Sequence, residues 1–545
     1  MKNLARFPLI SLLISLLSVL ALGLAACGGD GDSTDVADLG PDPATMAPAD
    51  SPIYIDAVVR PSGSMGDDLE SALSKLLATD DPGAKITDAF DESASDDGYT
   101  YGEDVEPWLG ARAGAFFTGY AAQAEEPQGA AVVAVTDADA AQAFLDKVAE
   151  DQPGTEQDLD YEGVSYRLDE DGVASGIDGD FLVVGPEQSF KDAVDAGAGE
   201  SLAENDDVNA DREPIPSDSL FSLYIDTPAV IDLIERDADL SPEDLEAFEL
   251  QIANYDEGPV TAWGRATSET MELGSVSPAA KGSTEPSDLI ESFPSEAWLA
   301  FSVGGLGDQI QAQFQQISDI IDSAQSGVGD LPSGFDSADL NAKIREKTGL
   351  DLSSDFDWMG DGGGFVEGSS LFGLGGALVI EATDEEGASS ALEKIRTALS
   401  KESSLQVSPT EGSGFQVQIP PVSAEVSLQD GKVVAAVGAA STEDALDPSE
   451  TLGDSDAFGA ARSSLGEDLA PSFYLSFPAV VSLIESTGEV TSDPDYQSAK
   501  PYLGALDYLI TGTSIDGDQA MSRVVLGLKE STGGEAETTA ATLTP

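Results

Sequence analysis

Carboxylates are the most abundant chemical groups in this sequence, and histidine does not occur in it. The 545 residues include 102 Asp and Glu, 24 Lys and Arg, and no His. Without histidine the commonest general base and the usual zinc ligand are lacking, which excludes Ser-His-Asp and Cys-His nucleophile systems. Cys27 is the single cysteine, so internal disulfides and sites built from several thiolates are excluded as well.

The enzyme class that remains would depend on carboxylates alone, as glycoside hydrolases do. A suitable pair could be assembled from many positions, and the four tryptophans leave few aromatic side chains for sugar subsites. The chain also lacks a G-x-S-x-G nucleophile elbow. We therefore expect no catalytic residues and no enzymatic activity, and a hydrolase using carboxylates alone is the less favoured alternative.

Two acidic loops and two glycine-rich segments invite a search for bound ions. Residues 96–98 and 169–172 resemble oxygen-rich calcium loops but do not follow the EF-hand spacing. Residues 360–365 and 373–376 complete neither G-x-G-x-x-G nor a Walker pattern, and their acidic surroundings would repel phosphate. We interpret the four segments as surface turns and tight strand packing, so no metal or cofactor is expected.

The charge and length restrict the partners and the architecture. A net charge of −78 argues against nucleic acid and against a bare anionic membrane surface, because no basic stripe is present. With 41% hydrophobic residues the chain can fold, and its length predicts two or more domains.

The N-terminus has the features of an export signal. Lys2 and Arg6 precede an apolar stretch over residues 8–24, and Leu24-Ala-Ala-Cys27-Gly resembles the lipobox of bacterial lipoproteins. The resemblance implies that residues 1–26 are removed and that Cys27 carries a diacylglyceryl group, which anchors the protein to the outer side of the cell membrane. An uncleaved membrane anchor, or a signal peptide with an incidental cysteine, remains open. Residues 27–47 are expected to form a disordered acidic tether.

A strand-to-helix junction occurs twice. Tyr224 to Glu235 and Tyr474 to Glu485 each combine a short apolar run, a proline and an apolar stripe at helical spacing, and the two copies differ by 250 positions. Similar offsets relate the turns around Trp108 and Trp358 and the strands and helices between them. The repeat predicts a first domain at residues 48–276, a linker at 277–287, a second domain at 288–529 and a disordered tail at 530–545.

Two other features could bind a ligand but are better explained by packing. Trp108 and Trp358 occupy equivalent places in the two copies, and duplicated aromatic residues more often fill a core. The helix expected over residues 307–324 carries an apolar stripe that could line a groove for a lipid or peptide, although such a stripe usually packs on its own sheet. The stripe consists of Ile310, Phe314, Ile317 and Ile321.

These repeated motifs, behind a bacterial export signal, resemble the bacterial family of domain of unknown function (DUF) 3352. The motifs are the Pro-Ala-Asp or Pro-Ser-Glu strand start, the Trp-Leu-Gly or Trp-Met-Gly turn, and the strand followed by Pro-Ala-Val. The likeness covers residues 48 to about 529, and the family's name implies no activity, cofactor or catalytic residue.

The sequence therefore predicts an α+β protein of two tandem homologous domains, each a mainly antiparallel sheet with helices packed on one face. We expect a non-catalytic, lipid-anchored envelope protein that binds an apolar ligand, a peptide or a protein, with a cleft between the lobes as the default place. The alternative is a structural or interaction component of the envelope without a ligand.

Overall fold

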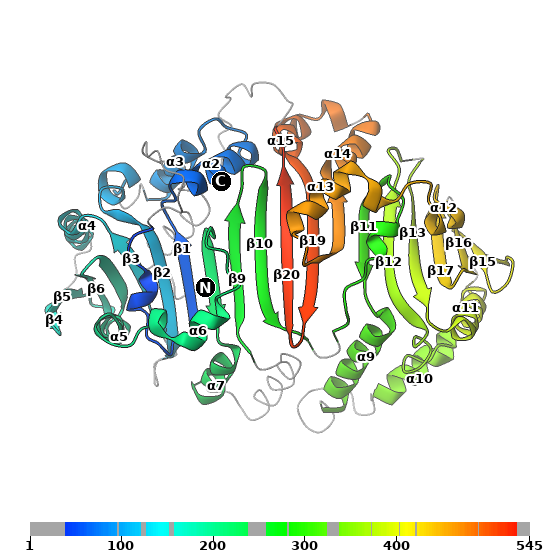
Figure 1. Cartoon of the computed structure of the whole chain (residues 1–545), viewed down its shortest axis with the longest axis horizontal. Helices are drawn as coiled ribbons and strands as arrows, with labels where there is room; N and C mark the ends of the chain where they lie inside the picture. The colour runs from blue at the N-terminus through cyan, green and yellow to red at the C-terminus, as the bar shows by residue number, and fades with distance from the viewer. Residues whose placement is uncertain are drawn as a thin grey trace. The chain divides into compact units, whose positions relative to one another are not determined.

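The computed structural model describes residues 39–530, with gaps at 95–97, 121–126, 152–156, 238–257, 281–282, 324–336, 372, 403, 420–421 and 489. The chain forms two compact units, and the boundary between them lies between Ser277 and Pro278. Among the described residues, unit 1 precedes this boundary and unit 2 follows it (Figure 1). Of the predicted linker, Ser287 is buried in unit 2, where its carbonyl accepts a hydrogen bond from Ser302 Oγ at 3.0 Å.

Unit 1 contains one antiparallel sheet with the strand order β4-β5-β6-β7-β3-β2-β1-β8-β9-β10. Neighbouring strands in this order are hydrogen-bonded, and the sequence fits because apolar and β-branched residues dominate the central strands. The strands are β1 (Ile53–Val58), β2 (Leu109–Tyr120), β3 (Pro127–Val135), β4 (Gln157–Tyr161), β5 (Val164–Leu168), β6 (Val173–Asp178), β7 (Phe181–Pro186), β8 (Phe221–Ile225), β9 (Val260–Ala266) and β10 (Thr270–Pro278).

Helices cover both faces of the unit 1 sheet. One buried cluster joins α3 and α4 to Val133 and Leu182, and another joins η3 and α5 to Val132 and Val183. Adjacent residues of a strand point to opposite faces, so the two clusters lie on opposite sides of the sheet. The helices are η3 (Pro43–Met46), α2 (Gly63–Leu76), α3 (Pro82–Ala94), η5 (Tyr101–Val105), α4 (Ala138–Asp151), α5 (Glu187–Ala198), η6 (Leu202–Glu204), α6 (Asp206–Asp211) and α7 (Thr227–Asp237).

Unit 2 contains an antiparallel sheet with the order β14-β15-β16-β17-β13-β12-β11-β18-β19-β20. Taken strand by strand, this is the order found in unit 1, with each strand replaced by the one ten numbers later. The strands are β11 (Ala297–Val303), β12 (Met359–Glu367), β13 (Gly375–Ala382), β14 (Gln406–Pro409), β15 (Phe415–Ile419), β16 (Val422–Gln429), β17 (Lys432–Gly438), β18 (Ala470–Ser476), β19 (Leu506–Asp516) and β20 (Gln519–Leu528).

Buried clusters again lie on both faces of the unit 2 sheet. The larger one joins α12 and α13 to Val434, and the smaller one joins α11 to Val433. The helices are η7 (Leu289–Ser292), α9 (Leu306–Ser323), α10 (Ser337–Thr348), α11 (Glu385–Leu399), α12 (Thr442–Leu446), η9 (Leu452–Asp454), α13 (Asp456–Leu465), α14 (Phe477–Ser486), η10 (Val490–Ser492) and α15 (Pro494–Ala505).

The predicted α+β class is confirmed, and the sheets are antiparallel as expected. The prediction that helices pack on only one face of each sheet is wrong for both units. Both faces of the strands are apolar, and helices pack on part of each face. The homology of the two domains, as a statement about descent, stays a prediction. The end of the tether expected to be disordered at residues 27–47 is ordered, because residues 43–46 form η3 and bury Ala44 and Met46. The other domain bounds and the interlobe cleft stay predictions.

The tryptophan turn has the same hydrogen bonds in both units. Trp108 Nε1 donates to the Asp104 carbonyl at 2.7 Å, and Trp358 Nε1 donates to the Asp355 carbonyl at 2.9 Å. A lysine then closes each turn on its aspartate, with Lys147 Nζ 2.6 Å from Asp104 Oδ1 and Lys394 Nζ 2.6 Å from Asp355 Oδ1.

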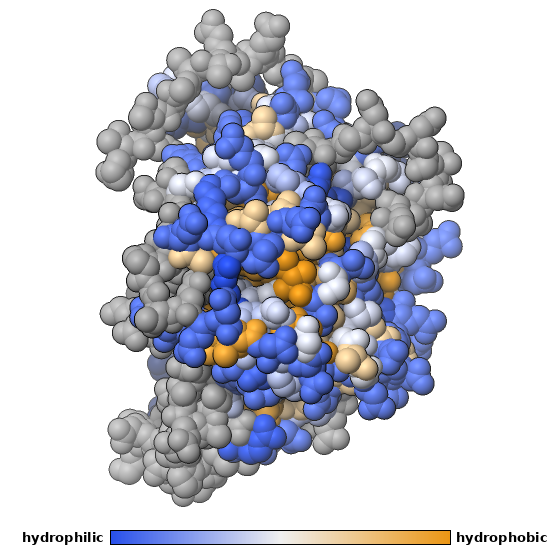
Figure 2. Space-filling view, turned by 90° about the vertical axis from the view of Figure 1, so that its left-hand side faces the viewer, coloured by the Kyte–Doolittle hydropathy of each residue, from blue (hydrophilic) through white to orange (hydrophobic). Residues whose placement is uncertain are grey.

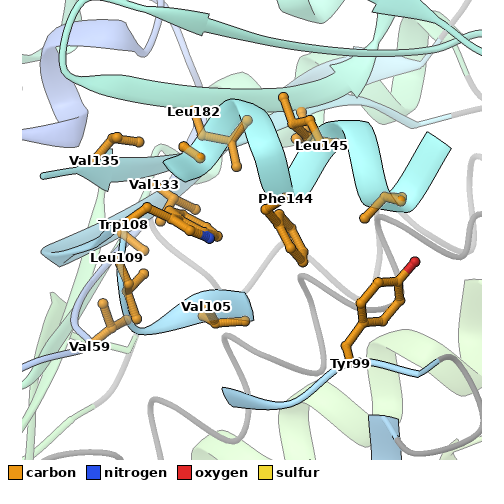
Figure 3. Close-up of a cluster of buried hydrophobic side chains, with 14 of the residues drawn as sticks. Val59, Tyr99, Val105, Trp108, Leu109, Val133, Val135, Phe144, Leu145 and Leu182 are labelled. Carbon is orange, nitrogen blue, oxygen red and sulfur yellow. The ribbon is translucent and has the colours of Figure 1, made fainter. Parts of the chain in front are cut away.

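Trp108 is fully buried, and its ring centroid lies 5.4 Å from that of Phe144 on α4 (Figure 3). Val133 and Leu182 of the sheet lie beside the indole in the same cluster. Trp358 is also buried, in the cluster beneath α11. Both tryptophans therefore act as core residues that attach a helix to its sheet.

Replacement of Trp108 should destabilise the protein strongly. Trp108→Ala removes a buried indole and leaves a cavity, so we expect the free energy of unfolding to fall by about 3–5 kcal/mol. Urea titration followed by circular dichroism measures this loss. Leu371→Ala is the control because Leu371 is 59% exposed, and it should change stability by less than about 0.5 kcal/mol. A similar small loss for both variants would contradict the core role of Trp108.

Candidate functional site

Several predictions made from the sequence concern residues outside the described part of the chain. These are the signal peptide at residues 1–26, Cys27, Asp96, Asp97 and nearly all of the tail at 530–545. The loop at residues 169–172 is a turn in which Asp169 Oδ1 accepts hydrogen bonds from the backbone N–H groups of Asp171 and Val173. Within the described part of the chain, no group of His, Cys, Asp and Glu side chains could hold a metal ion.

The first glycine-rich segment lies inside strand β12, and the second leads into strand β13. A Cβ atom at Gly363 would stand 2.5 Å from the Phe301 carbonyl oxygen, and one at Gly376 would stand 2.4 Å from the Phe365 carbonyl oxygen. Glycine at these positions permits close approach of neighbouring strands. The segments therefore serve strand packing in this fold.

An ionic cluster is buried beside the central strands of unit 1. Arg112 on β2 bonds to Asp56 on β1, and its Nη2 lies 3.0 Å from Oδ1 of Asp42. Arg212, at the end of α6, places Nη2 3.8 Å from Asp56 Oδ2, and its guanidinium lies 5.3 Å from the ring centroid of Tyr54. Two arginines and two aspartates thus balance each other's charge.

The environment of this cluster shifts its titration. Burial raises the pKa of Asp56, and the nearby Arg112 lowers it only in part. Burial also raises the pKa of Tyr54 well above its usual value, with Asp56 as the next contribution. The equivalent strand of unit 2 has Ala300 and Ser302 at these places, and Ser302 Oγ donates to a carbonyl. The cluster is thus a feature of unit 1. Its charged side chains pair with each other, whereas the Tyr54 hydroxyl is buried without a hydrogen-bond partner among the described residues.

The best candidate site is an apolar surface of the unit 2 sheet, which we call the open face. Strand pairing aligns its residues in two rows that run across the sheet. The first row is Ala435, Leu378, Gly364, Phe301, Phe473, Thr511 and Val524. The second row is Val437, Gly376, Val366, Leu299, Leu475, Leu509 and Leu526.

The open face is less covered than the opposite face. Residues that alternate with the two rows are buried in the larger cluster of unit 2, including Ala300, Phe365 and Tyr474. In the rows themselves several large side chains are exposed: Phe301 by 37%, Val524 by 38%, Val437 by 41% and Leu378 by 51%. An antiparallel sheet with one face in water normally has polar residues on that face. Here the face that helices cover least is apolar.

Two helices with unburied apolar residues contact the same strands. Leu306 at the start of α9 packs over Gly362, which is two residues from Gly364 and on the same face of β12. Beyond it, Ile310 and Phe314 are half-buried and Ile317 is 48% exposed, so the expectation that this stripe packs in the core holds only in part. The side chain of Ile321 lies outside the described residues.

Helix α14 is the second of these helices, and it belongs to the duplicated junction of the sequence. It contacts β19 and β11, and its apolar residues are half-buried at most. Pro478 is the second residue of α14 and Pro228 the second residue of α7, so both prolines lie in the first turn of their helices.

Unit 1 has a smaller surface of the same kind. Strand pairing aligns Ile55 with Ala115 and Leu223, and Ile53 with Phe117 and Ile225. Ile55 is 46% exposed and the others are half-buried. By contrast, the side of the molecule drawn in Figure 2 is mainly hydrophilic, with apolar residues in a central patch.

Sequence reasoning missed the open face, although a signal was present. Segments such as Ala297–Val303 and Lys432–Gly438 are apolar at nearly every position. Runs of this kind indicate a strand that is apolar on both faces, but they do not show which face lacks a cover.

The comparisons with known proteins identify the family. The fold is that of an α+β protein with two antiparallel units, and the family model described as "Protein of unknown function (DUF3352)" matches residues 82–523. The chain therefore belongs to the DUF3352 family. The comparison with curated proteins found no match.

Solved structures of TP0453 show a weak likeness. Crystal form IV is 12% identical, with a TM-score of 0.24 over 44% of this chain and 81% of that chain. Crystal form III is 13% identical, with a TM-score of 0.23 over 44% of this chain and 80% of that chain. Among the described residues, no helix is long and apolar enough to span a membrane.

The shifted carboxylates predict opposite pH dependences. The folded-state pKa of Asp56 is raised, so its contribution to stability is full below the unfolded-state pKa and is lost as the pH rises through the folded-state value. The pKa of Asp351 is lowered to about 2 by hydrogen bonds from Asn341 and Ser353, so its contribution is lost as the pH falls towards that value.

These signs can be measured with two matched variants. Urea unfolding is measured at several pH values. As the pH rises, the free energy of unfolding of wild type should fall relative to that of Asp56→Asn. Over the acidic range, it should rise with pH relative to that of Asp351→Asn. The same sign for both variants would contradict the assigned environments.

Proposed function

We propose that this DUF3352 protein is a lipid-anchored protein of the extracytoplasmic side of the bacterial cell membrane, and that it binds an apolar partner without catalysing a reaction. The anchor is a diacylglyceryl group on Cys27, and the binding surface is the open face. Nucleic acid is not a partner, because the net charge is −78.

The anchor is supported by the sequence around Cys27 and by the composition of the residues that follow it. The apolar stretch, the small residues at 25 and 26 and the cysteine follow the order of a lipoprotein signal. The first helix of the described residues is η3, whose N-cap is Asp42. The sequence between Cys27 and Asp42 is acidic and rich in Gly, the composition expected of a tether.

The open face is the single observation that carries the binding role. Its rows contain no charged side chain, and Thr511 is their one polar residue. Covering apolar surface is worth about 25 cal/mol per Å² removed from water. A partner that covers Phe301, Leu378 and Val437 would therefore gain binding energy without forming hydrogen bonds.

A hydrolase is less well supported. Burial raises the pKa of Glu367, and the negative charges of Asp444 and Glu296 raise it further. Three carboxylates therefore lie close together. However, Asp444 and Glu296 are exposed to solvent. The three carboxylates therefore do not form the dry pocket that is typical of a catalytic carboxyl with a raised pKa. An envelope component without a ligand is the other alternative, and it would leave the open face unoccupied.

Replacement of the cysteine should abolish the lipid modification. Cys27→Ser removes the only cysteine sulfur, which is the group that would accept the diacylglyceryl chain. We expect wild type in the membrane fraction with an N-terminal mass that includes the lipid, and the variant without that mass. An unmodified Cys27 thiol in the mature wild-type protein would contradict the anchor.

Binding at the open face can be tested with Nile red, an uncharged apolar dye. The paired change Phe301→Gln and Leu378→Gln should weaken dye binding about tenfold, because each side chain contributes roughly 0.7 kcal/mol of contact. Leu371→Gln is the control, since Leu371 is exposed but lies outside the two rows. Equal binding by all three proteins would place the dye elsewhere and would favour a component without a ligand.

A further inference from the structure

We propose that the partner of the open face in unit 2 is the hydrocarbon chain of a lipid whose head group carries no net negative charge. This inference rests on the proposed function, since it names the ligand class of the same surface. Four observations support it: the extent of the rows, their lack of hydrogen-bonding groups, the flanking helices and the charge of the chain.

The first row offers an extended strip of apolar surface. From Leu378 on β13 to Val524 on β20 it crosses six neighbouring strands. Neighbouring strands lie about 4.8 Å apart, so this part of the row spans on the order of 24 Å. Such a strip suits a long flexible chain better than a compact molecule.

The rows offer almost nothing to a polar ligand. Strands β11, β12 and β18 are each paired on both sides, so their backbone groups are already bonded. The hydroxyl of Thr511 lies 2.9 Å from that of Ser472. An extended peptide laid on this surface would bury backbone N–H and C=O groups without partners, which is costly. A hydrocarbon chain carries no such groups.

The two flanking helices add apolar contacts on the same unit. Helix α9 begins over Gly362 with Leu306 and carries the exposed Ile317, while α14 contacts β11 and β19 with a sequence rich in Val, Leu and Ile. Helix α14 is held to α15 through Glu485, which accepts hydrogen bonds from Tyr496 and Lys500 at 2.9 and 2.8 Å. Because neither helix buries its apolar residues fully, both retain surface for a ligand.

The net charge of the chain distinguishes between the candidate partners that remain. A second copy of a chain with a net charge of −78 would be repelled, and so would an anionic head group. Neutral or zwitterionic head groups avoid this repulsion while their hydrocarbon covers Phe301, Leu378 and Val437. The competing partner is an amphipathic helix of another protein, because the backbone hydrogen bonds of a helix are satisfied within the helix itself.

The test uses the chain from residue 27 with Cys27→Ser, so that its own lipid cannot compete. Fluorescent phosphatidylcholine, diacylglycerol and phosphatidylglycerol with the same acyl chain are titrated at low salt. We expect the first two to bind and the third to bind about tenfold more weakly, with the difference shrinking at high salt because salt screens charge repulsion. Phe301→Gln with Leu378→Gln should weaken phosphatidylcholine binding about tenfold, and Leu371→Gln should leave it unchanged.

The outcomes separate this inference from the proposed function. If Nile red binds in a manner that depends on Phe301 and Leu378 but none of the lipids does, the surface binds an apolar partner and the lipid assignment is overturned. Preferential binding of phosphatidylglycerol at low salt also overturns it, because the charge argument then fails. If neither dye nor lipid binds, both proposals fall together.

Discussion

A sheet with two apolar faces must be covered twice, and this requirement shapes both units of the protein. Alternate residues of β3 and β7 in unit 1 enter different buried clusters, and Val433 and Val434 do the same in unit 2. Helices and 3₁₀ turns supply both covers over part of each sheet. Where the second cover thins, around Phe301 and Leu378, apolar side chains meet solvent. The stability of the fold and its capacity to bind thus arise from the same strands.

The two units use the same strand order with different central chemistry. In unit 1 the carboxylate of Asp56 is removed from water, and Arg112 and Arg212 compensate its charge. The desolvation is nevertheless large enough to raise the pKa of Asp56. In unit 2 Ser302 needs only a carbonyl acceptor. Buried ion pairs often add little net stability but are costly to break singly. Removal of one partner from the unit 1 cluster would therefore leave an uncompensated charge in the fold.

Several elements of the fold could be predicted from sequence for clear physical reasons. Helix α9 has a strong periodic pattern and begins at Leu306, one residue before its expected start, and the two strand-to-helix junctions lie where the repeat predicts them. The helices that pack on the second face of each sheet could not be predicted, because an apolar strand does not show which helix packs against it. The helix stripe at Ile310 to Ile317 shows the difficulty: its spacing is that of a core helix, yet Ile317 is exposed. Its role depends on the distance between α9 and the sheet, which periodicity does not encode.

The first folded residues have a mechanical consequence. Asp42 caps η3 and pairs with Arg112, and the next turn buries Ala44 and Met46 against β2 and β3 near the middle of the unit 1 sheet. A pull on the residues before Asp42 would therefore act first on η3 and on its contacts with β2 and β3, in the middle of the sheet and not at an edge strand.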